Sequence, residues 1–480
     1  MKRILLRSGK SPFDVVTPEQ VISQDLIGTN SGNLLFSDAA HKILLTPGTE
    51  VTSNGIRTDP SPSSAARINE RYDVFVVPLA NAFRPSFQGA LDRLSQLIEQ
   101  LRIPVVVLGV GAQAGADYDT AGISELRPSV RRFMKAVLKR SESVGVRGEM
   151  TADYLRGLGF DEVEVIGCPS MFLHGDTFPE LPAFDGRRKL TPKARIAVNV
   201  SRGSSKVGPI AEIVEGTCRR YPNLGYFAQN LTDAELLFWG DTSHATGSTK
   251  RMPTLGTHPL LRDGRPRVPI DPVTWIEELR GYDFAFGTRI HGNIAALLAG
   301  TPAVVLCHDS RTLELCRYFE IPYQMLGELP ADTDPADLYE KADFSGLTGG
   351  HQERFERFTA FLDKHGLPNT FTHGDGGAAF DARLAELRLP DSIRRWDGSD
   401  DGALGYRIGW LREQTQRGQQ SLHKELKAAR ETLAELQARN EELERRTAAV
   451  EQRLAAPGPG PAATASAVRA WLRRRLERRA

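Results

Sequence analysis

The chain has 480 residues, more than one ordinary hydrophobic core needs, so its length predicts two globular domains with further segments attached. Its 61 Lys and Arg residues balance 60 Asp and Glu residues, and the formal charge of +1 argues against a protein that coats nucleic acid or an acidic surface. Four cysteines without a CxxC pair argue against a zinc knuckle and a disulfide framework. Because we find neither a signal-peptide pattern nor a long apolar run, we expect a soluble, cytoplasmic protein with no nucleic-acid partner.

Short apolar runs alternate with amphipathic segments along most of the chain. The apolar, β-branched runs predict strands at 72–79, 103–111, 143–148, 163–167, 195–201, 282–290 and 301–308. The amphipathic segments predict helices at 87–101, 129–140 and 150–160. Strands and helices in alternation predict an α/β fold with parallel sheets covered on both faces.

A stretch rich in proline and charge, residues 178–194, interrupts this alternation and is the predicted interdomain linker. We therefore expect two Rossmann-like α/β domains that face one cleft. The expected boundaries are 1–185 for the N-terminal domain, 186–375 for the C-terminal domain, 376–410 for a linker region, 411–456 for a coiled coil and 457–480 for a Pro/Gly linker with an Arg-rich tail.

Loops that leave the carboxyl ends of the strands bind ligands in open α/β sheets. The segment 27–44 places Asn30, Ser31 and Gly32 before a helix-like stretch, where backbone amides can hold an anion. A capped turn without a ligand explains the same pattern. The segment 108–115 spaces its glycines as GxGxxxG, which misses the GxGxxG fingerprint and argues against a Rossmann dehydrogenase.

The segment 286–306, FGTRIHGNIAALLAGTPAVVL, places Arg289, His291 and Gly292 between a strand and a helix. A fixed guanidinium can hold a phosphate or a carboxylate through two parallel hydrogen bonds, and an imidazole can carry a proton near neutral pH. The alternative is a buried capping arginine beside a satisfied histidine. The coincidence of the three residue types at one strand-to-helix junction favours a functional site.

Two further arginines follow predicted strands. Arg147 and Arg202 are candidates for anion binding, with surface salt bridges as the alternative. The ten histidines are scattered without ligand spacing, so we expect no metal site.

Residues 287–322 resemble the C-terminal signature of the polysaccharide pyruvyl transferase family, in which R-x-H-G precedes a small apolar helix, G-x-P, an apolar strand and a helix ending at I-P. Upstream, the segments 29–35, 105–111 and 143–160 resemble the family's N-x-G-D loop, its central strand and its V-R-D segment. The resemblance covers about residues 20 to 330.

The resemblance implies a transferase that moves the pyruvyl group of phosphoenolpyruvate onto sugar hydroxyls of a polysaccharide or glycan precursor, as a cyclic ketal. It also implies a two-domain fold similar to the GT-B glycosyltransferases, with the acceptor on the N-terminal side, the donor on the C-terminal side, and no cofactor besides the donor substrate. His291 is then the candidate acid-base catalyst. The candidate substrate-binding residues are Arg289, Gly292, Asn30, Ser31, Gly32, Arg147 and Arg202.

The chain departs from the family pattern at Asn33 and Gly148, where the family has acids, and in the loops 78–85 and 167–171. One alternative is therefore a nucleotide-sugar glycosyltransferase on the same fold, although the first acid after His291 is Asp309, beyond the next strand. A second alternative is a catalytically inactive platform for a coiled coil. Turnover of the donor by purified protein distinguishes the platform from the enzymes.

Apolar side chains recur beyond residue 400 at alternating spacings of three and four, which predicts a heptad. Charged flanks and a polar Asn440 at an a position favour a parallel homodimer; a long helix packed on its own domain is the alternative. The heptad residues are Leu426, Ala429, Leu433, Leu436, Asn440, Leu443, Thr447, Val450 and Leu454.

A Pro/Gly-rich linker, 457–465, leads to the tail 468–480, which has six arginines and one glutamate. The tail either lies on an anionic membrane through Trp471 and Leu472, which places the protein at the inner face of the membrane, or stays solvated. Salt-sensitive sedimentation with anionic vesicles distinguishes the two.

Overall fold

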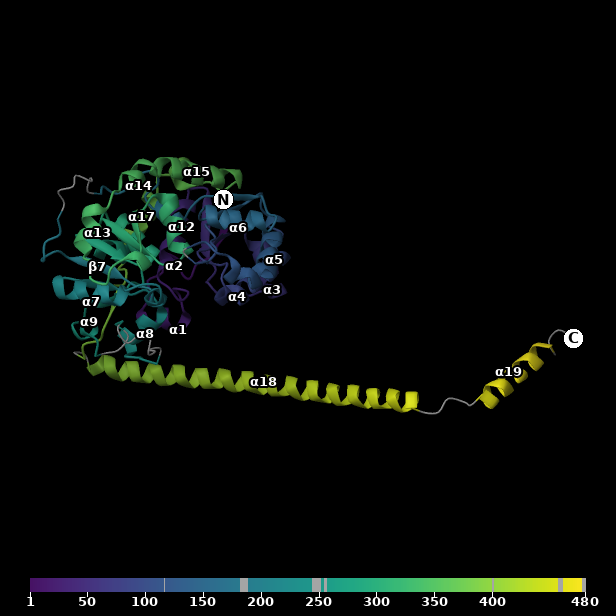
Figure 1. Ribbon diagram of the computed structural model, residues 1–480. Coiled ribbons are helices and arrows are strands. Elements are labelled where there is room, and N and C mark those ends of the chain that lie inside the picture. Colours follow the sequence, from purple (N-terminus) through teal and green to yellow (C-terminus); the bar gives the residue numbers. More distant parts are fainter. Residues whose placement is uncertain are drawn as a thin grey trace. The chain divides into compact units, whose positions relative to one another are not determined.

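The computed structural model describes residues 1–115, 117–181, 189–243, 252–253, 257–398, 401–455 and 461–476. The chain falls into two compact units, Met1–Asp397 and Gly398–Ala480. All described strands belong to the first unit (Figure 1).

A four-stranded parallel sheet in the order β2-β1-β3-β4 forms in the N-terminal part of the first unit. Ile4 in the inner strand β1 lies opposite Val51 in β2 and Val74 in β3. A bridge between Val110 and Val146 connects this sheet to the parallel pair β5-β6. The strands are β1 (Lys2–Leu6), β2 (Thr49–Ser53), β3 (Val74–Pro78), β4 (Val105–Leu108), β5 (Val144–Val146) and β6 (Val163–Val165).

Helices connect these strands. The α-helices are α1 (Pro18–Gln24), α2 (Gly32–Leu44), α3 (Pro62–Arg71), α4 (Gln88–Gln100), α5 (Arg127–Leu138) and α6 (Glu149–Gly157), and the 3₁₀ helices are η1 (Pro85–Phe87), η2 (Ala121–Leu126) and η3 (Pro169–Phe172). All five residues of β3 are buried, as in a continuous apolar strand covered on both faces.

A seven-stranded sheet in the order β12-β11-β10-β7-β8-β9-β13 forms in the C-terminal part of the first unit. Its pairs are parallel, except that β13 runs antiparallel to β9 at the edge. Phe286 in β10 lies opposite Val304 in β11 and Val198 in β7. The strands are β7 (Ile196–Asn199), β8 (Gly225–Phe227), β9 (Pro266–Val268), β10 (Phe284–Gly287), β11 (Ala303–Cys307), β12 (Tyr323–Met325) and β13 (Ile393–Arg394).

The helices of this part are mostly short. They are α7 (Ile210–Arg220), α8 (Leu231–Trp239), α9 (Pro259–Arg262), α10 (Pro272–Leu279), α11 (Ile290–Leu298), α12 (Ser310–Phe319), α13 (Pro335–Lys341), α14 (Ser345–Gly349), α15 (His351–Lys364), α16 (Thr370–His373) and α17 (Ala378–Ala385), with the 3₁₀ helices η4 (Arg202–Lys206) and η6 (Leu326–Glu328).

The structure confirms the predicted α/β class and the parallel pairing. Each strand predicted from an apolar run contains an observed strand, and the three predicted helices overlap α4, α5 and α6. The predicted linker 178–194 has no helix or strand among its described residues, and 182–188 lie outside the described residues.

The predicted linker region 376–410 is wrong over most of its length. It contains α17 and β13, and β13 pairs with β9 to complete the seven-stranded sheet. A strand of two residues is too short to show an alternation of apolar and polar residues, so sequence cannot predict it. It is recognised only from its pairing with β9 in the structure.

The second unit contains α18 (Asp401–Ala455) and α19 (Pro461–Leu476). Residues 411–455 of the predicted coiled coil lie within α18, and the leucines of the heptad are exposed in the single chain, with Leu433 at 56% and Leu436 at 58%. An exposed row of leucines on one helix is compatible with a parallel dimer, but a single chain does not test it, so the homodimer stays a prediction. Residues 456–460 of the predicted coiled-coil end and linker, and 477–480 of the predicted tail, lie outside the described residues.

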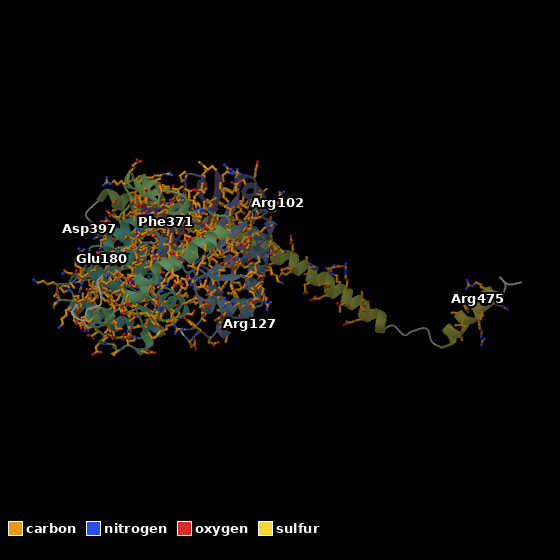
Figure 2. The ribbon with its side chains drawn as sticks, turned by 90° about the horizontal axis from the view of Figure 1, so that it is seen from above. Arg102, Arg127, Glu180, Phe371, Asp397 and Arg475 are labelled. Atoms are coloured by element: carbon orange, nitrogen blue, oxygen red, sulfur yellow. The ribbon has the colours of Figure 1, made fainter. Side chains whose placement is uncertain are left out.

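The described part of the Arg-rich tail is helical. Arg475 on α19 (Figure 2) places its guanidinium 4.7 Å from the ring centre of Trp471, and Trp471 is 54% exposed. Among the described residues, no helix is both long and apolar enough to cross a membrane.

Candidate active site

The junction of β10 and α11 brings Arg289 and His291 to the carboxyl edge of the seven-stranded sheet. Gly287 ends β10 with φ of 152°, and a Cβ there would lie 1.9 Å from the carbonyl oxygen of Asn199, so only glycine allows this strand to approach β7 so closely. Arg289 is the N-cap of α11, and its backbone N–H donates to the Asn199 side chain at 2.9 Å. The chain direction after β10 is therefore fixed by Asn199.

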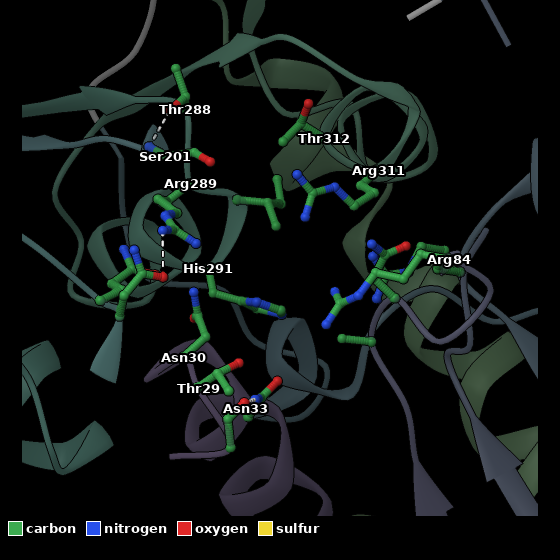
Figure 3. A pocket seen from close by; sticks show the side chains of 17 residues that line it. Thr29, Asn30, Asn33, Arg84, Ser201, Thr288, Arg289, His291, Arg311 and Thr312 are labelled. Carbon is green, nitrogen blue, oxygen red and sulfur yellow. Dashed lines mark hydrogen bonds between the residues drawn. The ribbon is translucent and has the colours of Figure 1, made fainter. Parts of the chain in front are cut away.

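A cavity of about 250 Å³ opens at this junction. Its walls combine the loop 28–33, the loop 80–84 after β3, and residues 288–291 (Figure 3). The backbone N–H of Ser31 donates to the carbonyl of Gln229 at 2.9 Å, and Asn30 forms an isolated bridge with Asn230. These bonds hold the loop 28–33 against the C-terminal part of the site, so that this loop and residues 288–291 line the same cavity.

Four arginines line the cavity: Arg84, Arg147, Arg289 and Arg311. Among the described residues that line it, none is Asp or Glu. Arg311 pairs with Asp309, which lies outside the lining, whereas the ion pairs of the described residues include none of the other three arginines. The cavity is therefore strongly electropositive, and its charge is only partly neutralised by the protein.

Arg289 is held in place by neutral acceptors. Its Nη2 donates to the Asn230 side chain at 2.7 Å and its Nε to the Val200 carbonyl at 3.3 Å. Burial lowers the pKa of Arg289 to about 10, so the guanidinium stays charged at neutral pH. A fixed guanidinium with no carboxylate partner is suited to bind an anion.

Arg147 is more deeply buried, with 2% of its surface exposed. A Cβ at Gly111 would lie 2.4 Å from its Cδ and Nε, so the guanidinium occupies the space that a side chain at Gly111 would fill. Its Nε donates to the Gly109 carbonyl at 3.4 Å, while its Nη2 has no hydrogen-bond partner among the described residues. Burial lowers the pKa of Arg147, because desolvation disfavours the charged guanidinium. A side chain this deeply buried, with one nitrogen unbonded, argues against the surface salt bridge considered from the sequence.

His291 is 8% exposed and lines the cavity. Burial, with a smaller contribution from the charge of Arg147, lowers its pKa to about 3. The imidazole is therefore neutral in the unliganded protein, which differs from the expectation of a proton carried near neutral pH. The difference arises because sequence shows neither the burial nor the neighbouring guanidinium.

The Sγ atom of Cys168 lies 3.6 Å from the imidazole Nε2 of His291. Burial raises the pKa of the Cys168 thiol, so both partners are neutral and no thiolate-imidazolium pair forms. The pair is therefore not an activated cysteine nucleophile. Among the described residues, no group of three His, Cys, Asp or Glu side chains is placed to hold a metal ion.

Of the three predicted residues Asn30, Ser31 and Gly32, only Asn30 lines the cavity. The Asn30 side chain accepts the Gly32 N–H at 2.8 Å, so this amide is not available to an anion. Gly32 instead allows close packing, because a Cβ there would lie 2.8 Å from His291. Ser31 is buried outside the cavity lining, and its hydroxyl donates to the Pro269 carbonyl at 2.6 Å.

Gly292 and Arg202 also lie outside the lining. A Cβ at Gly292 would lie 2.4 Å from the Gln229 amide, so this glycine admits Gln229 beside α11. Arg202 forms an ion pair with Asp233 at 2.5 Å, the alternative weighed from the sequence. The prediction of Arg202 as a ligand-binding residue is not supported, because its charge is neutralised within the protein.

The two departures from the family's acids have local physical reasons. The Asn33 side chain donates to the carbonyls of Ile27 and Gly28 at 2.9 and 2.8 Å, which a carboxylate could not do. A Cβ at Gly148 would lie 2.2 Å from Glu314, whose carboxyl accepts the Thr151 N–H at 2.7 Å. A carboxyl from α12 thus occupies the space beside Arg147 that a side chain at 148 would need.

Sequence reasoning missed Arg84 and Arg311. Arg84 belongs to the loop after β3, and Arg311 follows β11 at the start of α12; in Figure 3 both side chains point into the cavity. Both follow the carboxyl ends of predicted strands, so the rule on such loops could have indicated them. Nothing in the sequence shows that the two loops meet.

The sequence pattern of the polysaccharide pyruvyl transferase family matches residues 30–226 and 258–310, more than half of the chain. No curated protein matches this chain. Similar solved structures include a putative UDP-N-acetylglucosamine 2-epimerase from Listeria monocytogenes, with 10% identity, 81% of this chain and 98% of that chain covered, and a TM-score of 0.38. Another is Anabaena Alr3699/HepE in complex with UDP and glucose, with 11% identity, 81% and 100% covered, and a TM-score of 0.37.

A third is an uncharacterized protein from Klebsiella pneumoniae, with 13% identity, 68% of this chain and 93% of that chain covered, and a TM-score of 0.34. Likenesses this weak carry no argument about mechanism or substrate. The family pattern contains most of the residues that line the cavity, including Asn30, Arg147 and the R-x-H-G block, while Arg311 lies just beyond its end. The chain belongs to the polysaccharide pyruvyl transferase family and is a transferase that acts on polysaccharides.

Proposed function

We propose that the protein transfers the pyruvyl group of phosphoenolpyruvate to two hydroxyls of one sugar in a polysaccharide or glycan precursor, forming a ketal. The observation that carries this proposal is the cavity with four arginines, no lining carboxylate among the described residues, and a buried histidine. Phosphoenolpyruvate bears a phosphate and a carboxylate on one three-carbon unit, so several guanidinium groups can bind it at once.

Arg289 and Arg147 are the proposed donor-binding residues because both line the cavity and neither guanidinium has a carboxylate partner among the described residues. Ile290 and His291 line the cavity at the N-terminal end of α11, where backbone amides favour an anion. Burial lowers the pKa of His291 more than Arg147 does, and the donor's negative charge would act against both by favouring the protonated imidazole. His291 could then take up a proton when the donor binds.

The proposed reaction conserves atoms and protons. Protonation of C3 of phosphoenolpyruvate by His291 leaves a cation at C2, which the first sugar hydroxyl attacks, and the proton of that hydroxyl returns to His291. The second hydroxyl then attacks C2 and the C2–O bond to phosphate breaks, so that inorganic phosphate leaves with the proton of that hydroxyl. The product is a ketal at C2, and the arginines stabilise the departing phosphate.

A GT-B-like arrangement of two domains, with the donor on the C-terminal side, belongs to this proposal. It is supported by a cavity whose walls come from both 28–33 and 288–291. We propose a cytoplasmic location, where phosphoenolpyruvate is available to the enzyme.

The donor is tested by thermal melting of the full-length protein with phosphoenolpyruvate and, separately, with UDP-glucose. A ligand that binds only the folded state raises the melting temperature. At a ligand concentration about a hundred times its dissociation constant, it stabilises the folded state by about 2.7 kcal/mol. We expect phosphoenolpyruvate to raise it and UDP-glucose to leave it unchanged. Stabilisation by UDP-glucose alone would favour the nucleotide-sugar glycosyltransferase.

We further propose that α18 dimerises the protein as a parallel coiled coil. Replacing Leu433 and Leu436 by lysine should give a monomer in light scattering, because two charges would be buried in the seam. Lysine at Ala434 and Ala438, which lie off the seam in the same heptad, adds the same charge and should leave the dimer intact. A wild-type monomer, or equal masses for the two double variants, would contradict the coiled coil.

A further inference from the structure

A second cavity, of about 330 Å³, adjoins the proposed donor cavity. The two share a wall of six lining residues: Gly28, Thr29, Asn33, Ala80, Asn81 and Arg84. The rest of the second cavity comes mainly from Arg7 after β1, the loop 56–58, and the segment 82–93 that includes the start of α4, with Asp25, Phe36 and Leu79 in addition. A ligand in the second cavity would therefore lie beside a donor bound in the first.

The second cavity is also electropositive. Its lining includes Arg7, Arg57, Arg84 and Arg93 against a single carboxyl, Asp25. The ion pairs of the described residues include none of these four arginines. Asp25 accepts the backbone N–H of Thr29 at 2.7 Å, and burial raises its pKa, while the charge of Arg57 acts in the opposite direction. One carboxyl cannot balance four guanidinium groups.

Arg7 is the most informative of the four. It is 8% exposed, its Nη2 donates to the Ile56 carbonyl at 3.3 Å, and its Nε has no hydrogen-bond partner among the described residues. Arg84 likewise has an Nε without a partner, and the two guanidinium groups lie 5.9 and 5.7 Å from the ring centre of Phe87. A buried charged group with unsatisfied hydrogen-bond donors destabilises the folded protein unless a ligand supplies the missing acceptors.

We propose that the second cavity binds a phosphate group carried by the sugar acceptor, so that the acceptor is a phosphate-bearing glycan precursor. The inference rests on the proposed function, because the shared wall would place the acceptor's hydroxyls beside the donor's C2. A phosphate offers several oxygens to guanidinium groups that converge from separate segments, and each pair can form two parallel hydrogen bonds. The arginines of the donor cavity other than Arg84 stay free to bind phosphoenolpyruvate.

The test is isothermal titration of full-length protein, saturated with phosphoenolpyruvate, with inorganic pyrophosphate as the probe. We expect pyrophosphate to bind the wild type under these conditions and the double variant Arg57→Ala, Arg93→Ala to bind it at least about tenfold more weakly, as loss of charged hydrogen bonds predicts. Both arginines are exposed, so their removal should not affect folding. Arg102→Ala removes an exposed arginine that is absent from the lining and should leave the affinity unchanged.

Pyrophosphate that binds only when phosphoenolpyruvate is absent would occupy the donor cavity and overturn the proposal. Equal affinity in the double variant and in Arg102→Ala would overturn it as well. Sodium glucuronate that binds with the expected arginine dependence, while pyrophosphate does not, would reassign the cavity to carboxylates. Pyrophosphate binding that persists in a protein unable to bind phosphoenolpyruvate would contradict the proposed donor and leave the second anion site standing.

Discussion

Arg289→Ala should raise the KM for phosphoenolpyruvate by about ten- to a hundredfold, because removal of a charged hydrogen-bonding partner costs about 1.5–3 kcal/mol. The expectation follows from a part-buried guanidinium held by Asn230 and Val200 without a carboxylate. Arg289→Lys keeps the charge but loses the planar pair of donors, so its KM should fall between those of the wild type and the alanine variant. Steady-state kinetics with varied donor measures all three.

Arg202→Ala is the matched control. Arg202 belongs to the same part of the fold, but it is paired with Asp233 and does not line the cavity. Its removal should change the KM for phosphoenolpyruvate by less than about twofold, which is less than a lost charged contact would produce. Melting curves without donor separate a loss of binding from a loss of folding. Equal KM values for Arg202→Ala and Arg289→Ala would remove Arg289 from the donor site.

His291→Asn should lower kcat by on the order of a hundredfold with little change in donor binding, as expected for loss of a general acid. The pKa of His291 is lowered to about 3 in the empty cavity, so its protonation should depend on the bound donor. For the wild type, kcat should then fall as the pH rises through the pKa of His291 in the complex. This inflection should be absent from the profile of His291→Asn, because asparagine does not titrate there.

Cys168→Ala controls for the only other reactive side chain that contacts the imidazole among the described residues. Since burial raises the pKa of its thiol, Cys168 is not expected to act as a nucleophile, and its removal should retain most of the turnover. A loss of activity in Cys168→Ala as large as that in His291→Asn would contradict the assignment. So would a profile of kcat against pH that is identical in the wild type and His291→Asn.

The predictable part of the fold consists of strands with continuous apolar runs. The residues of β3, β10 and β11 are all buried, and burial on both faces requires apolar side chains at every position. β8 and β9 were not predicted, because β8 begins with Gly225 and β9 with Pro266, two residue types that are unfavourable in strands. The equally short β5 and β6 were predicted because each begins and ends with valine. β13 exists because its two residues pair with β9, and sequence separates these strands by more than a hundred positions.

The candidate site shows the same division. Arg289 and His291 were predictable because they stand together after a strand, and the cavity contains both. Arg84 and Arg311 were not, because each stands alone in its own loop and only packing brings the loops together. Gly32 and Gly292 were predicted as anion-binding residues, whereas the structure uses them to admit His291 and Gln229.

The sequence by itself determined the α/β class, the family, and the block that carries Arg289 and His291, because each depends on residues that are neighbours in the chain. Only the tertiary structure decided which arginines are paired and which are free, and whether His291 is charged. Asp233 neutralises Arg202, while no carboxylate of the described residues pairs with Arg147. Charge pairing and desolvation act through space over a few ångströms, so they depend on contacts that chain order does not contain.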